Sequence, residues 1–245
     1  MSINFLLLLV VFAVVGGPLA AGDVSSGALV FVFVVAGWIL SLCLHEFGHA
    51  YIAFQGGDRS VKDRGYLTLD PVRYTDPLTS IILPAAIVAM GGIGFPGGAV
   101  YIHRQAIRTP LWRAGMSFAG PAMTGVSLVL FALPFLLGLI DTAPAAFRGA
   151  LAFLCYLQAT ALLFNLLPVP GLDGFGIIEG FLSDRTLVAI EPVRRYAIFA
   201  LFFVILAAPW LISPLFEAAR AIVEGLGVDV RWMADGYRMF QFWKG

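Results

Sequence analysis

The sequence predicts an all-α polytopic membrane protein with about five to six transmembrane helices and a short re-entrant or membrane-associated β-hairpin region. The hydrophobic fraction is 60% and the charged fraction only 12%, whereas roughly a quarter of the residues in a soluble domain are charged. Apolar runs long enough to cross a bilayer also recur along the chain. We therefore expect residues 1–245 to form a single integral-membrane domain.

Composition also narrows the choice of partners. The formal net charge is zero, which gives no reason to expect binding to nucleic acid. Cys43 and Cys155 both fall in apolar runs and resemble packing residues, so the sequence indicates neither a disulfide framework nor a cysteine-ligated metal.

The first two spans are predicted over residues 3–21 and 28–55. Small residues near the end of the first run could mark a signal-peptide cleavage site. However, no lysine or arginine precedes this run, and it is long for the apolar core of a signal peptide. We therefore interpret residues 3–21 as an uncleaved transmembrane helix. In the second span, the run from Ala28 to Leu44 contains no charged residue.

The next part of the chain changes character. Residues 56–76 interleave charges with Gly and Pro and are interpreted as a loop, in which Tyr66–Leu69 alternate enough to suggest a short strand. Residues 77–92 are apolar but short, so a re-entrant segment competes with a true span. The Gly-rich residues 91–100 suggest an extended hairpin that lies close to another backbone.

Three further spans are predicted over residues 111–140, 149–169 and 193–212. Pro209 and Pro214 leave open whether residues 213–226 continue as a kinked helix or form a separate interfacial helix. The C-terminal tail, residues 213–245, ends in an amphipathic and aromatic sequence that is suited to contact with the membrane interface.

The basic residues predict an orientation. They concentrate in residues 56–76, 103–113 and 184–195, which the positive-inside rule assigns to the cytoplasm. For the first two segments to share a side, the apolar piece between them must enter and leave through the same face, which favours the re-entrant interpretation. We expect a multi-pass protein of the bacterial inner (cytoplasmic) membrane.

A metal-binding pattern, His45-Glu46-Phe47-Gly48-His49, lies near the C-terminal end of the second predicted span. Residues four apart lie on one face of a helix, so His45 and His49 can bind one metal ion together. Glu46 projects beside them without needing to be a ligand, which is where a general base belongs.

A third ligand is predicted from depth in the membrane. The spans 28–55 and 149–169 both run from outside to inside, so Asp173, just beyond the second of them, reaches a depth similar to that of His45 and His49. A catalytic zinc ion needs at least one more protein ligand, and a carboxylate is suitable. A charged carboxylate at this depth is costly without a partner. The alternative is that Asp173 caps a turn in the Pro-Gly loop.

These two motifs, His-Glu-Phe-Gly-His and the stretch Asn165-Leu-Leu-Pro-Val-Pro-Gly-Leu-Asp173-Gly, resemble the site-2 protease family of intramembrane zinc metalloproteases. The resemblance extends to Ala119-Gly120-Pro121 and covers about residues 35–182. It implies that His45, His49 and Asp173 bind one Zn²⁺ ion and that Glu46 activates water. The chain is similar to the compact branch that has neither a PDZ domain nor a nucleotide-sensing domain, and the site is expected toward the cytoplasmic side.

The chain departs from the family pattern at two points. Thr124 stands where many relatives have an asparagine, and the passage from Gly94 to Gly98 lacks a lysine that is common in the compact branch. Substrate binding or oxyanion support is predicted for Asn165, Thr124, Gly97 and Gly98, of which the two glycines could pair with an extended substrate by strand addition. Asn165 could instead hydrogen-bond at the end of its helix.

The predicted function is hydrolysis of peptide bonds in or near transmembrane segments of other proteins, as in regulated intramembrane proteolysis. The expected partners are a transmembrane protein substrate and the lipid bilayer, and oligomer formation is left open. The competing class is a zinc-holding membrane scaffold or a metal transporter. A transporter would be expected to show repeated halves or polar residues distributed along a path.

Overall fold

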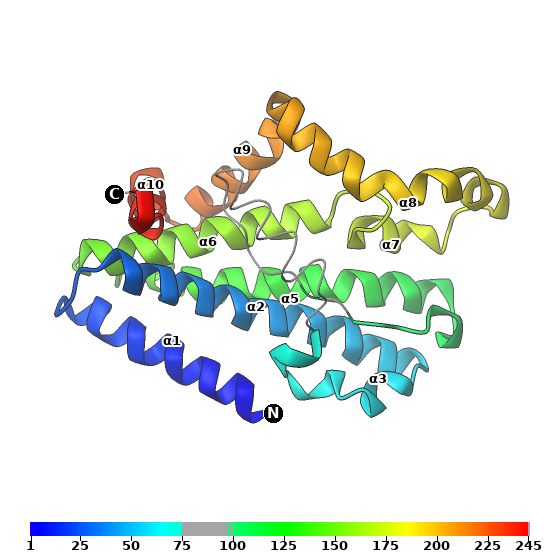
Figure 1. The fold of residues 1–245 in the computed structure, drawn as a ribbon, viewed down its shortest axis with the longest axis horizontal. Helices are drawn as coiled ribbons and strands as arrows, with labels where there is room; N and C mark the ends of the chain where they lie inside the picture. Colours follow the sequence, from blue (N-terminus) through cyan, green and yellow to red (C-terminus); the bar gives the residue numbers. More distant parts are fainter. Residues whose placement is uncertain (75–97, 99, 245) are drawn as a thin grey trace.

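The computed structural model describes residues 1–74, 98 and 100–244, and within this part of the chain every regular element is a helix (Figure 1). Among these described residues, four helices are long and apolar enough to cross a membrane, and a bent helix pair would make a fifth span. The all-α membrane fold is thus confirmed in outline, with four to five candidate spans. The four helices are α1 (Ile3–Ala21), α2 (Gly27–Gly56), α5 (Pro110–Leu136) and α6 (Ala145–Asn165).

The predicted re-entrant segment 77–92 lies outside the described residues, as does Gly97. The same holds for most of the predicted hairpin 91–100, of which only residues 98 and 100 are described.

Helix α2 is the central element of the bundle, because it contacts α1, α5, α6 and the C-terminal helix α10 (Val230–Phe240). It meets the backbone of α5 at Gly48, where an added Cβ would lie 2.7 Å from the carbonyl oxygen of Ala119. Glycine permits this approach since it has no side chain. The histidine-bearing end of α2 is thereby held against the middle of α5.

The loop that follows α2 folds back over the start of the chain. It contains α3 (Ser60–Asp63) and two 3₁₀ turns, Tyr66–Thr68 and Pro71–Tyr74. The amide of Ser2 donates to the carbonyl of Thr68 at 2.7 Å. The N-terminus of α1 therefore lies beside the loop that follows the C-terminal end of α2.

The predicted strand over Tyr66–Leu69 is wrong, because Tyr66–Thr68 form a 3₁₀ turn. Gly65 before the turn and Leu69 after it both adopt left-handed backbone conformations, which end an extended strand. The hydroxyl of Thr68 donates to the carbonyl of Gly65 at 2.6 Å. The hydroxyl and the amide of Thr68 thus both donate to the carbonyl of Gly65, which needs no partner strand.

The end of α6 places the next short helix. After Asn165 the chain passes Pro168 and Pro170, which cannot donate a helical N–H bond, and α7 begins at Asp173 and runs to Glu179. Helix α7 packs against α5. Helix α2 packs against α5 as well. Helix α5 therefore lies between the two elements and places Asp173 of α7 near the histidines of α2.

The expected span over residues 193–212 is not one continuous helix. Helix α8 covers Asp184–Ala207, and α9 covers Pro209–Gly225 after a bend of 85°. Pro209 has no N–H group and disfavours helical geometry at the residue before it, and Ala208 has φ −140° and ψ 61°. The residues after 208 therefore form a separate helix, which continues through Pro214.

The C-terminal tail packs onto the bundle. Phe240 of α10 lies 5.4 Å from Phe153 of α6 and 5.0 Å from Phe31 of α2, measured between ring centroids. Helices α10 and α6 also cross at two glycines, since a Cβ on Gly236 would clash with the carbonyl of Gly149. Phe240, in the tail that the sequence suggested for the membrane interface, is thus buried against protein, and α10 lies beside the start of α6 (Figure 1).

The glycine contact between α10 and α6 makes a testable prediction. Gly236→Ala should lower the free energy of unfolding by about 1–3 kcal/mol, since the added methyl overpacks a backbone contact. The matched control is Gly225→Ala, where an added Cβ has no neighbour within 4 Å. Thermal unfolding in detergent measures both variants, and equal melting temperatures would contradict the proposed packing.

Candidate metal centre

Three side chains from two helices converge inside the bundle. The Nε2 atoms of His45 and His49 on α2 are 3.1 Å apart, and each lies 3.2 Å from a carboxylate oxygen of Asp173 on α7. Both histidines are buried, and Asp173 is partly buried. A tetrahedral zinc ion with bonds of about 2.0–2.1 Å separates its nitrogen ligands by roughly 3.3 Å. The three groups therefore have the identity and spacing of a metal-binding set.

The ring nitrogens that face away from this cluster have partners of their own. Nδ1 of His45 lies 2.9 Å from the hydroxyl oxygen of Thr124, and Nδ1 of His49 lies 2.7 Å from the carbonyl oxygen of Met116. With protons on Nδ1, both rings donate to α5 and present a bare Nε2 to the metal. Thr124 in turn donates to the carbonyl of Gly120 at 3.4 Å. Helix α5 thus orients both imidazoles.

Gly120 leaves the space that the two rings occupy. A Cβ at this position would clash with the ring of His49 and would stand 2.7 Å from Nε2 of His45. The Ala119-Gly120-Pro121 motif therefore has a structural role that its sequence alone did not indicate. The cluster fits zinc by donor chemistry, since two imidazoles and a carboxylate are common ligands of a catalytic zinc ion.

Asp173 does not act as a turn cap. Leu172 occupies the N-cap position of α7, and no described side chain accepts a hydrogen bond from the first turn of this helix. Its two carboxylate oxygens instead each lie 3.2 Å from an imidazole Nε2 atom. The carboxyl group is therefore directed at the histidines.

Glu46 lies next to the cluster and is 4% exposed. The described residue Gly98 passes directly over its carboxylate, because a Cβ on Gly98 would lie 3.1 Å from Oε1 of Glu46. The structure thus brings two of the sequence-predicted residues together at the metal cluster. Gly98 could not carry a bulky side chain without displacing Glu46.

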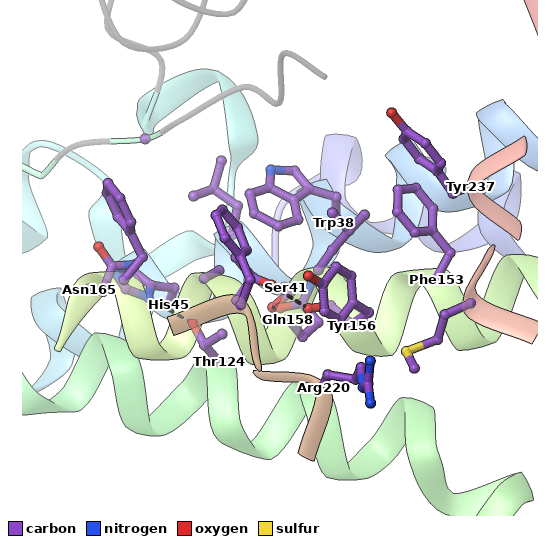
Figure 2. A pocket seen from close by; sticks show the side chains of 18 of the residues that line it. Trp38, Ser41, His45, Thr124, Phe153, Tyr156, Gln158, Asn165, Arg220 and Tyr237 are labelled. Carbon is purple, nitrogen blue, oxygen red and sulfur yellow. Dashed lines mark hydrogen bonds between the residues drawn. The ribbon is translucent and has the colours of Figure 1, made fainter. Parts of the chain in front are cut away.

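A cavity of about 920 Å³ begins at this cluster and extends between α2, α6, α9 and α10. Figure 2 shows its walls, on which Asn165 and His45 lie at one end and Phe153 and Tyr237 at the other. Most of the lining side chains are apolar or aromatic. Asn165 is the last residue of α6. It also lines a smaller pocket together with the three residues of the metal cluster, and therefore lies near that cluster.

Two polar residues of this cavity were not singled out from the sequence. The hydroxyl of Ser41 donates to Oε1 of Gln158 at 2.6 Å (Figure 2). Gln158 is 1% exposed, and its Nε2 has no hydrogen-bond partner within the described residues. Ser41 precedes His45 by one helical turn, and this spacing was the available signal for its position.

Similar proteins agree with this chemistry. The chain is 45% identical to a protein of Mycolicibacterium smegmatis named as zinc metalloprotease Rip2, over 98% of this chain and 93% of the relative. It is 43% identical to the Rip2 protein of Mycobacterium tuberculosis, over 94% of this chain and 89% of the relative. It is 31% identical to the Bacillus subtilis protein named as zinc metalloprotease YwhC, over 77% of this chain and 87% of the relative.

The chain has no match among protein-family models and no significant match among solved structures. The relatives nevertheless cover nearly its whole length, and the four apolar helices make it an integral membrane protein. Zinc is its cofactor and peptide-bond hydrolysis its activity. The chain therefore belongs to the site-2 protease family of zinc metalloproteases.

Proposed function

We propose that this metalloprotease cleaves peptide bonds in or next to transmembrane segments of other membrane proteins. The observation that carries the proposal is the position of the metal cluster, which lies on the wall of a largely apolar cavity of about 920 Å³ inside a bundle of membrane-spanning helices. A soluble peptide has no need of such surroundings. An apolar segment, in contrast, would leave lipid for this cavity with little loss of favourable environment.

We assign His45, His49 and Asp173 as the ligands of one zinc ion. When bound, zinc supplies a Lewis acid that polarises the scissile carbonyl and lowers the pKa of a water molecule. The chain's own contribution is to hold the two imidazoles in fixed orientations through Thr124 and Met116. This arrangement reduces the reorganisation that the site undergoes on binding.

Glu46 is assigned as the general base. It accepts a proton from the attacking water and passes this proton to the leaving amine. Its support is geometric, since it precedes His49 by three residues on the same helix and lines the same cavity as His45. Burial keeps competing water away from this carboxylate.

Substrate handling is assigned to the residues around Glu46. A helical peptide bond is shielded by its own turn, so the substrate must unwind locally. Gly98 offers its backbone beside Glu46, where an extended substrate could add as a strand, and Asn165 lines the same space. Thr124 would contribute indirectly, through its bond to His45.

We assign the site to the cytoplasmic side of the bacterial inner membrane. The segments rich in arginine meet at one end of the bundle, since Arg64 contacts His103 and Glu179 pairs with both Arg104 and Arg194. By the positive-inside rule this end faces the cytoplasm. Cleavage there would release cytoplasmic regulators from the membrane, as in regulated intramembrane proteolysis.

The general-base role makes the first prediction about activity. Glu46→Gln should keep one zinc ion per chain and lower the rate of cleavage at least about 100-fold, because proton transfer is lost while the ligands stay. The measurements are metal analysis of the purified protein and cleavage of a model transmembrane substrate in vesicles. His49→Ala serves as the contrast, since it should lose the metal as well. Cleavage that persists in Glu46→Gln would refute the mechanism.

Gly120 provides a test of the metal centre that leaves the ligands unchanged. Gly120→Ala should lower zinc content severalfold, because its methyl group occupies the space of the His49 ring. Gly125→Ala on the same helix is the matched control, since its Cβ would only touch Leu162 at 3.9 Å. Full zinc occupancy in Gly120→Ala would show that the imidazoles bind metal in another arrangement.

The strand-addition proposal is tested at Gly98. Gly98→Val should lower cleavage about tenfold or more, since the added side chain fills the space beside the Glu46 carboxylate that an extended substrate would enter. Zinc content should stay unchanged, which separates an effect on substrate from loss of the metal centre. Unchanged cleavage by this variant would remove Gly98 from substrate binding.

A further inference from the structure

A second pocket, of about 300 Å³, meets the metal cluster from another side. It shares His45, Glu46, Gly98 and Asn165 with the large cavity. Its other walls come from α5, from the turn before α7 and from the 3₁₀ turn Arg104–Ala106. The cluster therefore lies between an apolar chamber and a smaller chamber that contains charged and hydroxyl groups.

Two hydrogen-bond donors converge in this smaller chamber. The point where a Cβ on Gly176 would stand is 3.0 Å from Nη2 of Arg104 and 2.5 Å from Oγ of Ser117. Both donors thus pack against the bare Cα of Gly176 on α7, and both side chains belong to the wall of the chamber. Ser117 is 1% exposed, and its hydroxyl has no hydrogen-bond partner within the described residues. A buried hydroxyl without a partner is costly, so its presence points to a ligand.

The charged side chains that line the chamber, among the described residues, are Glu46, Asp173 and Arg104. Nη1 of Arg104 pairs with one carboxylate oxygen of Glu179, and Arg194 pairs with the other at 2.5 Å. Two guanidinium groups therefore share one carboxylate. Glu46 and Asp173 would offset the two charges of a bound zinc ion, which would leave Arg104 as the net charge among the described lining residues. Arg104 lines the chamber, whereas Arg194 does not.

We propose that this chamber is a subsite for a carboxylate side chain of the substrate, an aspartate or a glutamate located close to the scissile bond on the side of the arginine-rich loops. The planar guanidinium of Arg104 suits a carboxylate, and the Ser117 hydroxyl supplies a second donor. This inference rests on the proposed function and adds a sequence preference to it. Substrates would combine an apolar stretch with an acidic residue next to the cut.

The backbone before Arg104 is held by a hydrogen bond to Asp58. The buried carboxylate of Asp58 accepts a hydrogen bond from the backbone amide of His103 at 2.7 Å. It also holds the Ser60 amide at 3.0 Å and the Ser60 hydroxyl at 2.7 Å. The loop after α2 therefore holds the residue that precedes Arg104, so the cation is presented to the chamber by rigid backbone.

The experiment uses the full chain in vesicles with a model transmembrane substrate. Aspartate is placed at each of several successive positions beside the scissile bond, each paired with an asparagine version. At one position the aspartate substrate should show a kcat/KM about tenfold higher than its asparagine partner, as expected for a hydrogen-bonded charge pair. Arg104→Gln should abolish this ratio, and Ser117→Ala should reduce it.

Arg194→Gln is the matched control. This variant also removes one positive charge and one of the two partners of Glu179. Because Arg194 does not line the chamber, the preference for aspartate should remain. The subsite is refuted if no position shows a preference, if both arginine variants lower the ratio equally, or if Arg104→Gln slows both substrates alike.

The outcomes also separate this inference from the proposed function. If aspartate and asparagine substrates are cleaved equally by the wild type and neither is cleaved by Glu46→Gln, only the subsite fails. If Glu46→Gln cleaves them, or the wild type cleaves none, the proposed function fails and the subsite with it. Zinc content of Arg104→Gln verifies that the metal centre is intact.

Discussion

The close approach of α2 and α5 is the constraint on which the metal centre depends. Gly48 lets α2 contact the carbonyl of Ala119, and Gly120 lets the rings of His45 and His49 lie against α5. A single methyl at either glycine would separate the helices or displace an imidazole. Helix packing in a bilayer relies on small residues because lipid is as apolar as the side chains it replaces. Here that packing rule also sets the geometry of the ligands.

Polar groups inside an apolar bundle must find partners, and this requirement explains several contacts around the site. The hydroxyl of Thr124 and the carbonyl of Met116 lie beside the outer nitrogens of the two imidazoles. Asp173 lies against the inner nitrogens. Through its contact with Nδ1 of His45, Thr124 orients a proposed ligand.

The proposed zinc site lies where two chambers of different chemistry meet, and this arrangement suggests how a membrane protein can be hydrolysed. The larger chamber is lined mostly by apolar side chains, and the smaller contains Arg104 and Ser117. A polypeptide that passes from lipid toward the arginine-rich end would place its apolar part in one chamber and its polar part in the other. The scissile bond would then lie beside Glu46, at the boundary between the two chambers.

The sequence by itself determined the helical membrane class, the two motifs and the convergence of His45, His49 and Asp173, because hydropathy and helical spacing are local properties. It did not predict the 3₁₀ turn at Tyr66, the bend before Pro209 or the packing of the tail on α6. The roles of Gly120, Ser117 and Arg104 were decided by tertiary structure alone. The groups that these residues contact belong to elements far apart in the chain. A local sequence pattern therefore cannot predict that the histidine rings lie against Gly120, or that Ser117 and Arg104 lie against Gly176.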